Sequence, residues 1–97
     1  MSIRSFSCRD TETFFNTGNV GKKSGWKSIA KIVARKLDML EYAEELNDLK
    51  VPPGNRLEAL KGDRKGQFGI RINDQWRIVF RWTPVGPKDV EIIDYHS

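Results

Sequence analysis

Residues 67–82 read QFGIRINDQWRIVFRW, two runs of alternating side chains on either side of a polar turn. Alternation of apolar and polar residues is typical of a β-strand with one buried face. A two-residue turn would place Ile70 opposite Arg77 and mix apolar with charged side chains on one face. A three-residue turn instead pairs apolar residues three times over: Ile72 with Trp76, Ile70 with Ile78, and Phe68 with Phe80. The stretch therefore predicts an antiparallel hairpin with one apolar face.

The chain before this hairpin has helical periodicity. From Ser24 onward, apolar residues recur at steps of three and four, the period of an amphipathic helix: Trp26, Ile29, Ala30, Val33, Leu37 and Leu40. A shorter helix is predicted over residues 9–15, with Asp10 or Thr11 as its cap and Gly18 after its end. Residues 2–7 predict a weak first strand, and the prolines of VPPGN (51–55) end the helical region.

Further strands are predicted on both sides of the hairpin. RLEAL (56–60) forms a short strand, TPVGPK (83–88) a connection, and DVEIIDYH (89–96) the last strand. The order β-α-α-β-β-β-β predicts an α+β fold with two N-terminal helices on one face of a small antiparallel sheet. At 97 residues, we expect a single domain over 1–97.

Composition narrows the classes of function. The net charge of +4 favours polyanionic partners. One cysteine, Cys8, and one histidine, His96, leave no metal-binding cluster, so neither metal nor cofactor is predicted, and a reducing, cytoplasmic setting is expected. No apolar run is long enough for a signal peptide or a membrane span.

The face of the hairpin opposite the apolar one is basic. Arg71 and Arg77 are predicted to lie directly opposite each other, an arrangement that costs up to about 1 kcal/mol. An anionic ligand between them would remove this cost, and two side chains that splay into water would reduce it. Lys61 and Arg64, in the glycine-containing loop KGDRKG (61–66), add positive charge at the same end of the sheet.

Two other polar features have both a functional and an ordinary interpretation. The last residues, DYHS (94–97), hold His96, whose imidazole can transfer protons near neutral pH, although a terminal histidine is more often a bystander. Lys27, Lys31 and Arg35 lie four residues apart on a polar face of the predicted long helix, where a solvated surface is the favoured interpretation.

The stretches RLEALKGDRKGQFGIRINDQWRIVFRW (56–82) and DVEIIDYH (89–96) resemble the HigB-type toxins, the plasmid maintenance or killer-protein branch of the RelE/ParE superfamily of toxin–antitoxin systems. The likeness covers nearly the whole chain. It implies a metal-independent mRNA interferase, an endoribonuclease that cuts the translated message in the A site of the 70S ribosome. It also implies a cognate helix-turn-helix antitoxin of the HigA type, through which operator DNA is bound, and no membrane partner.

The resemblance also implies roles for individual residues. Asp94, Tyr95 and His96 match the terminal acidic, aromatic and histidine positions of the RNA-cleaving members. Lys61 and Arg77 match basic residues suited to hold the scissile phosphate, with Arg71 and Arg64 as further RNA-binding candidates.

Glu58 departs from the family pattern, because HigB-type members have a histidine there, in LHPL where this chain has LEAL. The working hypothesis makes Glu58 or Asp94 the base or orienting carboxylate, His96 the general acid, and Tyr95 a residue that stacks on a nucleotide. A structural ion pair between Glu58 and a nearby cation stays an open alternative.

Two other functions stay open at this point. One is ParE-like poisoning of DNA gyrase, and the other is a non-catalytic module that binds an antitoxin or nucleic acid. Loss of toxicity in His96→Gln would favour RNA cleavage, and undiminished toxicity would favour gyrase.

Overall fold

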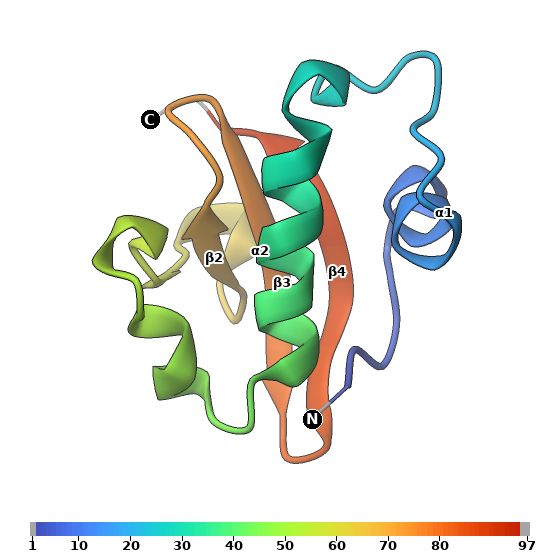
Figure 1. The fold of residues 1–97 in the computed structure, drawn as a ribbon. Coiled ribbons are helices and arrows are strands. Elements are labelled where there is room, and N and C mark those ends of the chain that lie inside the picture. Colours follow the sequence, from blue (N-terminus) through green and yellow to red (C-terminus); the bar gives the residue numbers. More distant parts are fainter. Residues whose placement is uncertain (1, 96–97) are drawn as a thin grey trace.

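The computed structural model describes residues 2–95. Its helices and strands are α1 (Arg9–Thr17), α2 (Ala30–Tyr42), β1 (Glu58–Ala59), β2 (Phe68–Arg71), β3 (Trp76–Thr83) and β4 (Gly86–Asp94). Short 3-10 helices lie between them: η1 (Lys27–Ile29), η2 (Leu46–Lys50), η3 (Pro53–Asn55) and η4 (Gly62–Arg64). The strands form one antiparallel sheet in the order β1-β2-β3-β4; α2 lies across one face, and α1 stands beside β4 (Figure 1). The predicted α+β class is confirmed.

The register of the central hairpin agrees with the three-residue turn. Phe68 pairs with Phe80 and Ile70 with Ile78, and the Ile72 N–H donates to the Trp76 carbonyl at 2.9 Å. We call the face of the sheet that α2 covers the inner face, and the opposite face the outer face. Because side chains alternate along a strand, this register sends Phe68, Ile70, Ile78 and Phe80 to the inner face.

The hydrophobic core lies between α2 and the inner face. Val33 and Leu37 of α2 and Ile70, Ile78 and Phe80 of the hairpin are all completely buried. Other members of the same cluster come from α1, η2 and β4: Phe14, Leu49, Val90 and Ile92. Burial of each large apolar side chain stabilises the fold by about 1.5–3 kcal/mol, so this layer accounts for the position of α2.

The helical region differs from the prediction at its boundaries. The predicted long helix begins with the 3-10 turn η1, and regular α-helix starts at Ala30. Neither Asp10 nor Thr11 caps α1, because the helix already begins at Arg9 after Cys8, and Thr11 is buried within it. Gly18 ends α1 as predicted: its φ of 81° is left-handed, and its N–H donates to the Phe14 carbonyl at 2.8 Å.

The C-terminal hairpin is tighter than predicted. Residues 83–88 do not form a connection, because β3 continues to Thr83 and β4 starts at Gly86. The Thr83 hydroxyl donates to the Gly86 carbonyl at 2.7 Å and accepts from the Val85 N–H, so a two-residue turn suffices. The expected first strand is only a parallel bridge between Phe6 and Val90.

A buried polar pair joins α2 to η3. Asn55 is completely buried, and its Oδ1 accepts a hydrogen bond from Lys36 Nζ at 2.5 Å. The Asn55 amide donates to the carbonyls of Leu49 and Val51. One side chain thus provides hydrogen-bond partners for two carbonyls at the end of η2 and for the Lys36 ammonium of α2. Burial, and then the charges of Arg35 and Arg71, lower the pKa of Lys36.

We predict that Asn55→Ala lowers the free energy of unfolding by about 2–3 kcal/mol, because it leaves the Lys36 ammonium and two carbonyls without a partner. Urea unfolding followed by circular dichroism measures this change. The control is Asn47→Ala, an exposed asparagine in η2, which should change stability by less than about 0.5 kcal/mol. Equal effects of the two substitutions would contradict the structural role of Asn55.

No helix within residues 2–95 has the length and the apolar run needed to cross a lipid bilayer.

Candidate functional site

The outer face of the sheet carries two adjacent rows of paired residues. One row crosses all four strands: Glu58, Gly69, Val79 and Glu91. The next row contains Arg71, Arg77 and Ile93. Rows lie about 7 Å apart and neighbouring strands about 4.8 Å apart, so the Cα atoms of Glu58 and Arg77 are separated by about 12 Å.

The middle of the outer face is apolar and closed to solvent. Val79 is completely buried and Leu60 is 8% exposed, although both lie outside the core beneath α2. A Cβ atom on Gly69 would be 3.5 Å from Leu60 and 3.7 Å from Val79, in ordinary contact with both, so Leu60 and Val79 lie side by side over this position of the outer face. Gln67, two positions before Gly69 on the same face, is also buried. Charged groups therefore surround a small apolar patch formed by Leu60, Gly69 and Val79, which we call the apolar floor.

Arg71 and Arg77 lie opposite each other in the register, and each guanidinium has its own partners. Arg71 forms an ion pair with Asp74, and Arg77 Nη1 donates to the carbonyls of Asn73 and Trp76 at 2.6 and 3.3 Å. These contacts hold the two guanidinium groups at the hairpin turn. Arg71, by its hydrogen bond and then by its charge, lowers the pKa of the Asp74 carboxyl.

Gln75 holds the last described residues against the hairpin. Its carbonyl accepts the Tyr95 N–H at 2.6 Å, and its Nε2 donates to Asp94 Oδ2 at 2.9 Å. The Arg77 guanidinium lies over the Tyr95 ring, 5.2 Å from the ring centroid. Tyr95 is thus placed beside Arg77 on the outer face. Asp94, which pairs with Trp76, is the preceding residue in the alternation and so belongs to the other face of the sheet. Sequence reasoning did not single out Gln75, whose only signal is its place in the turn.

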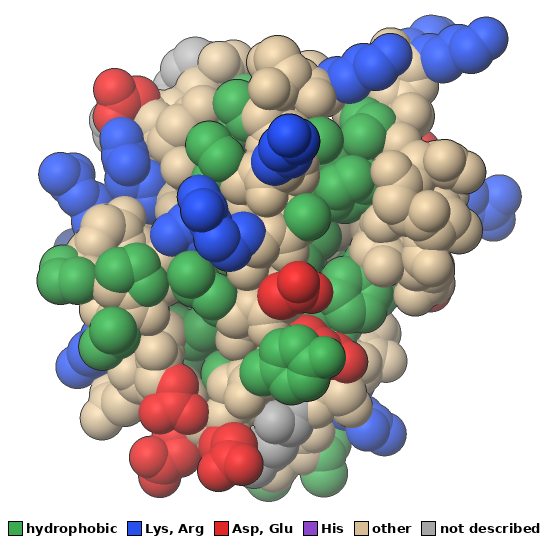
Figure 2. Space-filling view, in the orientation of Figure 1, with side chains coloured by type: hydrophobic (Ala, Val, Ile, Leu, Met, Phe, Trp, Pro, Cys, Tyr) green, Lys and Arg blue, Asp and Glu red, His purple; other side chains and the backbone are tan. Residues whose placement is uncertain are grey.

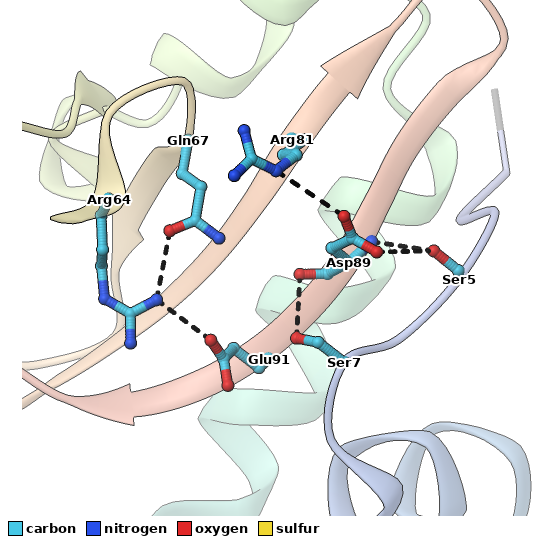
Figure 3. A network of polar contacts seen from close by, with 7 residues as sticks. All are labelled: Ser5, Ser7, Arg64, Gln67, Arg81, Asp89 and Glu91. Carbon is cyan, nitrogen blue, oxygen red and sulfur yellow. Dashed lines mark hydrogen bonds and ion pairs between the residues drawn. The ribbon is translucent and has the colours of Figure 1, made fainter.

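Arg64 is tied to β4. Its Nη1 donates to Glu91 Oε1 at 3.0 Å and to Gln67 Oε1 at 3.1 Å (Figure 3). Figure 3 also shows Arg81 beside Asp89, 3.7 Å away, and Ser5 bound to the Asp89 N–H. Arg64 therefore anchors the loop that contains Lys61, and its Nη1 is already engaged in hydrogen bonds with Glu91 and Gln67. Sequence reasoning missed Glu91, which the alternation of β4 places opposite Val79 on the outer face.

Lys61 and Glu58, like Asp94, are exposed members of the predicted set. Lys61 precedes η4 and Glu58 starts β1; among residues 2–95, no ion pair joins either of them to another side chain. In the described part of the chain, Glu58 thus has no cationic partner for the structural salt bridge that was the alternative to a catalytic role. His96 lies outside the described residues.

The outer face combines an available carboxylate, several fixed cations and an aromatic ring. A carboxylate can accept a proton, cations can stabilise an anionic phosphorane, and an aromatic ring can stack on a base. No group of three His, Cys, Asp or Glu side chains within residues 2–95 is arranged to hold a metal ion.

Comparison with solved structures identifies the class of fold. The chain aligns over its full length with the YoeB–YefM complex from Staphylococcus aureus (TM-score 0.55, 16% identity, all of that chain covered). It also aligns with the YoeB dimer from S. aureus (TM-score 0.54, 18% identity, 98% covered) and with the YoeB/ParE toxin from Agrobacterium tumefaciens (TM-score 0.50, 23% identity, all covered). The fold is that of the YoeB/ParE class.

Sequence comparison gives the family. Residues 4–96 match the model for the HigB-like toxin, described as the RelE-like toxin of type II toxin–antitoxin system HigB. The toxin HigB-1 of Vibrio cholerae is 47% identical over 56 residues, and an uncharacterised protein of Haemophilus influenzae is 36% identical over 69 residues. These alignments cover 58% and 71% of this chain, and 59% and 67% of the respective relatives. The chain belongs to the HigB-like toxin family.

We predict that Arg71→Gln raises the pKa of the Asp74 carboxyl toward its ordinary value, because the substitution removes the guanidinium that favours the ionised form. NMR titration of the Asp74 side-chain carboxyl carbon measures this pKa. Arg56→Gln, which removes a cation that acts on Asp74 more weakly, serves as the control and should produce a smaller change. An unchanged Asp74 pKa in Arg71→Gln would show that the ion pair is absent in solution.

Proposed function

We propose that the chain is the toxin of a type II toxin–antitoxin pair and acts as an mRNA interferase, cutting messages on the ribosome through the outer face of its sheet. The observation that carries this proposal is that Glu58 and Arg77 lie in adjacent rows of the outer face beside one apolar floor, with Lys61 at the start of the neighbouring loop. About 12 Å separates the Cα atoms of Glu58 and Arg77, enough for a phosphodiester between the two side chains. A cognate antitoxin of the HigA type would neutralise the toxin.

In the proposed reaction, the RNA 2′-hydroxyl attacks the adjacent phosphate and releases the 5′ oxygen of the next nucleotide. Glu58 accepts the proton of the hydroxyl, and Arg77 and Lys61 stabilise the negative charge of the phosphorane. His96 donates a proton to the leaving oxygen. Tyr95, whose ring lies against Arg77, stacks on a neighbouring base.

Arg71, Arg64 and Asp94 have supporting roles in this scheme. Arg71 adds positive charge in the same row as Arg77. Arg64 holds the Lys61 loop through Glu91, so it positions Lys61 more than it contacts RNA. Asp94, bound by Gln75, orients the terminal segment.

We predict that Glu58→Gln reduces message cleavage by about 10²–10⁴-fold, because an amide cannot take up the hydroxyl proton. The measurement is regulated expression of the chain in bacteria, with primer extension to map new 5′ ends in translated messages. The control is Glu12→Gln, an exposed carboxylate on α1, which should cleave like the original chain. Both purified variants are compared by thermal unfolding, so that loss of folding is recognised.

His96→Gln tests the mechanism against the gyrase alternative. If His96→Gln abolishes both the new 5′ ends and the growth arrest, the proposal is supported. Growth arrest that persists in His96→Gln without new 5′ ends would contradict it and point to a gyrase poison. Binding of the antitoxin or of RNA with no cleavage by the original chain would reduce the protein to a binding module.

A further inference from the structure

A third row of residues crosses the outer face at the end of the sheet away from the β2–β3 turn. Arg81 pairs with Lys88, and one further step of the β2–β3 register brings Gln67 opposite Arg81. We call Gln67, Arg81 and Lys88 the far row. Because rows lie about 7 Å apart, the far row is about 14 Å from the row of Arg77, with the apolar floor between them. The reaction proposed above uses neither Arg81 nor Lys88.

The Arg81 guanidinium is held in place, yet most of its donors are unused. Its Nε lies 3.7 Å from Asp89 Oδ2, an ion pair too long for a hydrogen bond. Its Nη1 lies against the loop that follows η4, since a Cβ atom on Gly66 would come within 2.7 Å of it. The Arg81 side chain is 42% exposed. Gly66 thus leaves room for a guanidinium that is fixed by its surroundings and still open to solvent.

The carboxylates of this region are already engaged. Glu91 accepts from Arg64 at 3.0 Å, and Asp89 is the ion-pair partner of Arg81. Lys88 is exposed, and no carboxylate among residues 2–95 forms an ion pair with it. Three cations therefore meet two carboxylates at this end of the outer face, and the charge of Lys88 is in excess.

Sheet stability does not account for the pairing of Arg81 with Lys88. Like charges directly opposite each other on neighbouring strands destabilise a sheet, and an anion between them removes the repulsion. A neutral donor also lies beside them. Figure 3 shows Gln67 between Arg64 and Arg81, and Gln67 Oε1 accepts from Arg64, so its Nε2 is turned toward the Arg81 side. Two cations and one amide donor thus converge at the far row.

We propose that the far row binds a backbone phosphate of the message, away from the phosphate that is cut. About 14 Å separates the far row from Arg77, the span of roughly two nucleotides of an extended strand. Proteins bind single-stranded nucleic acid in grooves whose cations follow the backbone. The outer face has this form, with the apolar floor between two basic rows. This inference rests on the proposed function, because the ligand is the message.

A 2′-O-methyl RNA heptanucleotide tests the contact, because it lacks the attacking hydroxyl and is bound without being cut. An uncharged methylphosphonate replaces one linkage at a time, and fluorescence anisotropy with the full chain gives each Kd. At one linkage, we expect the replacement to weaken binding of the original chain about 10-fold, but that of Arg81→Gln/Lys88→Gln less than about 2-fold. This linkage should lie about two linkages from the one at which Arg77→Gln removes the effect.

The matched control is Arg9→Gln/Lys50→Gln, which removes the same charge from α1 and η2, outside the sheet. Figure 2 shows further basic side chains on the α2 side of the molecule, away from the outer face, so an effect of net charge alone would appear in both variants. Arg81→Gln/Lys88→Gln should lower the slope of log K against log salt by about 1.4, the loss of two phosphate contacts with a single strand. The control should retain the original slope.

Lys88→Gln alone is a second variant that leaves Arg81 and its contacts in place. It should lower the salt slope by about 0.7, one phosphate contact. It should not lower the melting temperature followed by circular dichroism, because it removes a repulsion. A fall in affinity with unchanged melting temperature therefore reports lost binding and not lost folding.

Three results would overturn the proposal: a methylphosphonate effect in Arg81→Gln/Lys88→Gln as large as in the original chain at every linkage, an equal loss of affinity in the control, or no saturable binding of the heptanucleotide by the original chain. Failure of the proposed cleavage reaction gives a different result. If the original chain makes no new 5′ ends in cells while the far row still couples to one linkage, the outer face binds RNA without cutting it.

Discussion

The in-register pairing of β2 with β3 is the constraint on which the rest of the structure depends. Ile70 opposite Ile78 and Phe68 opposite Phe80 give the sheet one continuous apolar face, and α2 lies across it. A shift of one residue would turn these side chains away from α2 and bring Arg71 or Arg77 toward the core. Burial of the inner face therefore also determines which side chains the outer face displays.

The outer face shows how a small sheet can hold like charges close together. Arg71 and Arg77 oppose each other, yet each guanidinium has its own partner: Asp74 for Arg71, and two backbone carbonyls at the hairpin turn for Arg77. The same turn carries Gln75, which binds both Asp94 and Tyr95. One turn thus arranges the cations and the end of β4, so that the Tyr95 ring lies against Arg77.

The two charged surfaces lie on opposite sides of a molecule whose extents are only 33 × 28 × 26 Å. The outer face has an exposed carboxylate among cations, an arrangement suited to chemistry on a phosphodiester. On the outward side of the helical layer, Lys27, Lys31 and Arg35 form no ion pair within residues 2–95.

The sequence by itself determined the class of the fold, the hairpin register and the amphipathic helix, because alternation and three-to-four-residue spacing are local properties of the chain. It did not determine that Arg64 is held by Glu91 or that Gln75 binds both Asp94 and Tyr95. These contacts join residues that are 19 to 27 positions apart. Only the tertiary structure decides them, since each needs two separate segments to be placed before either side chain has a partner.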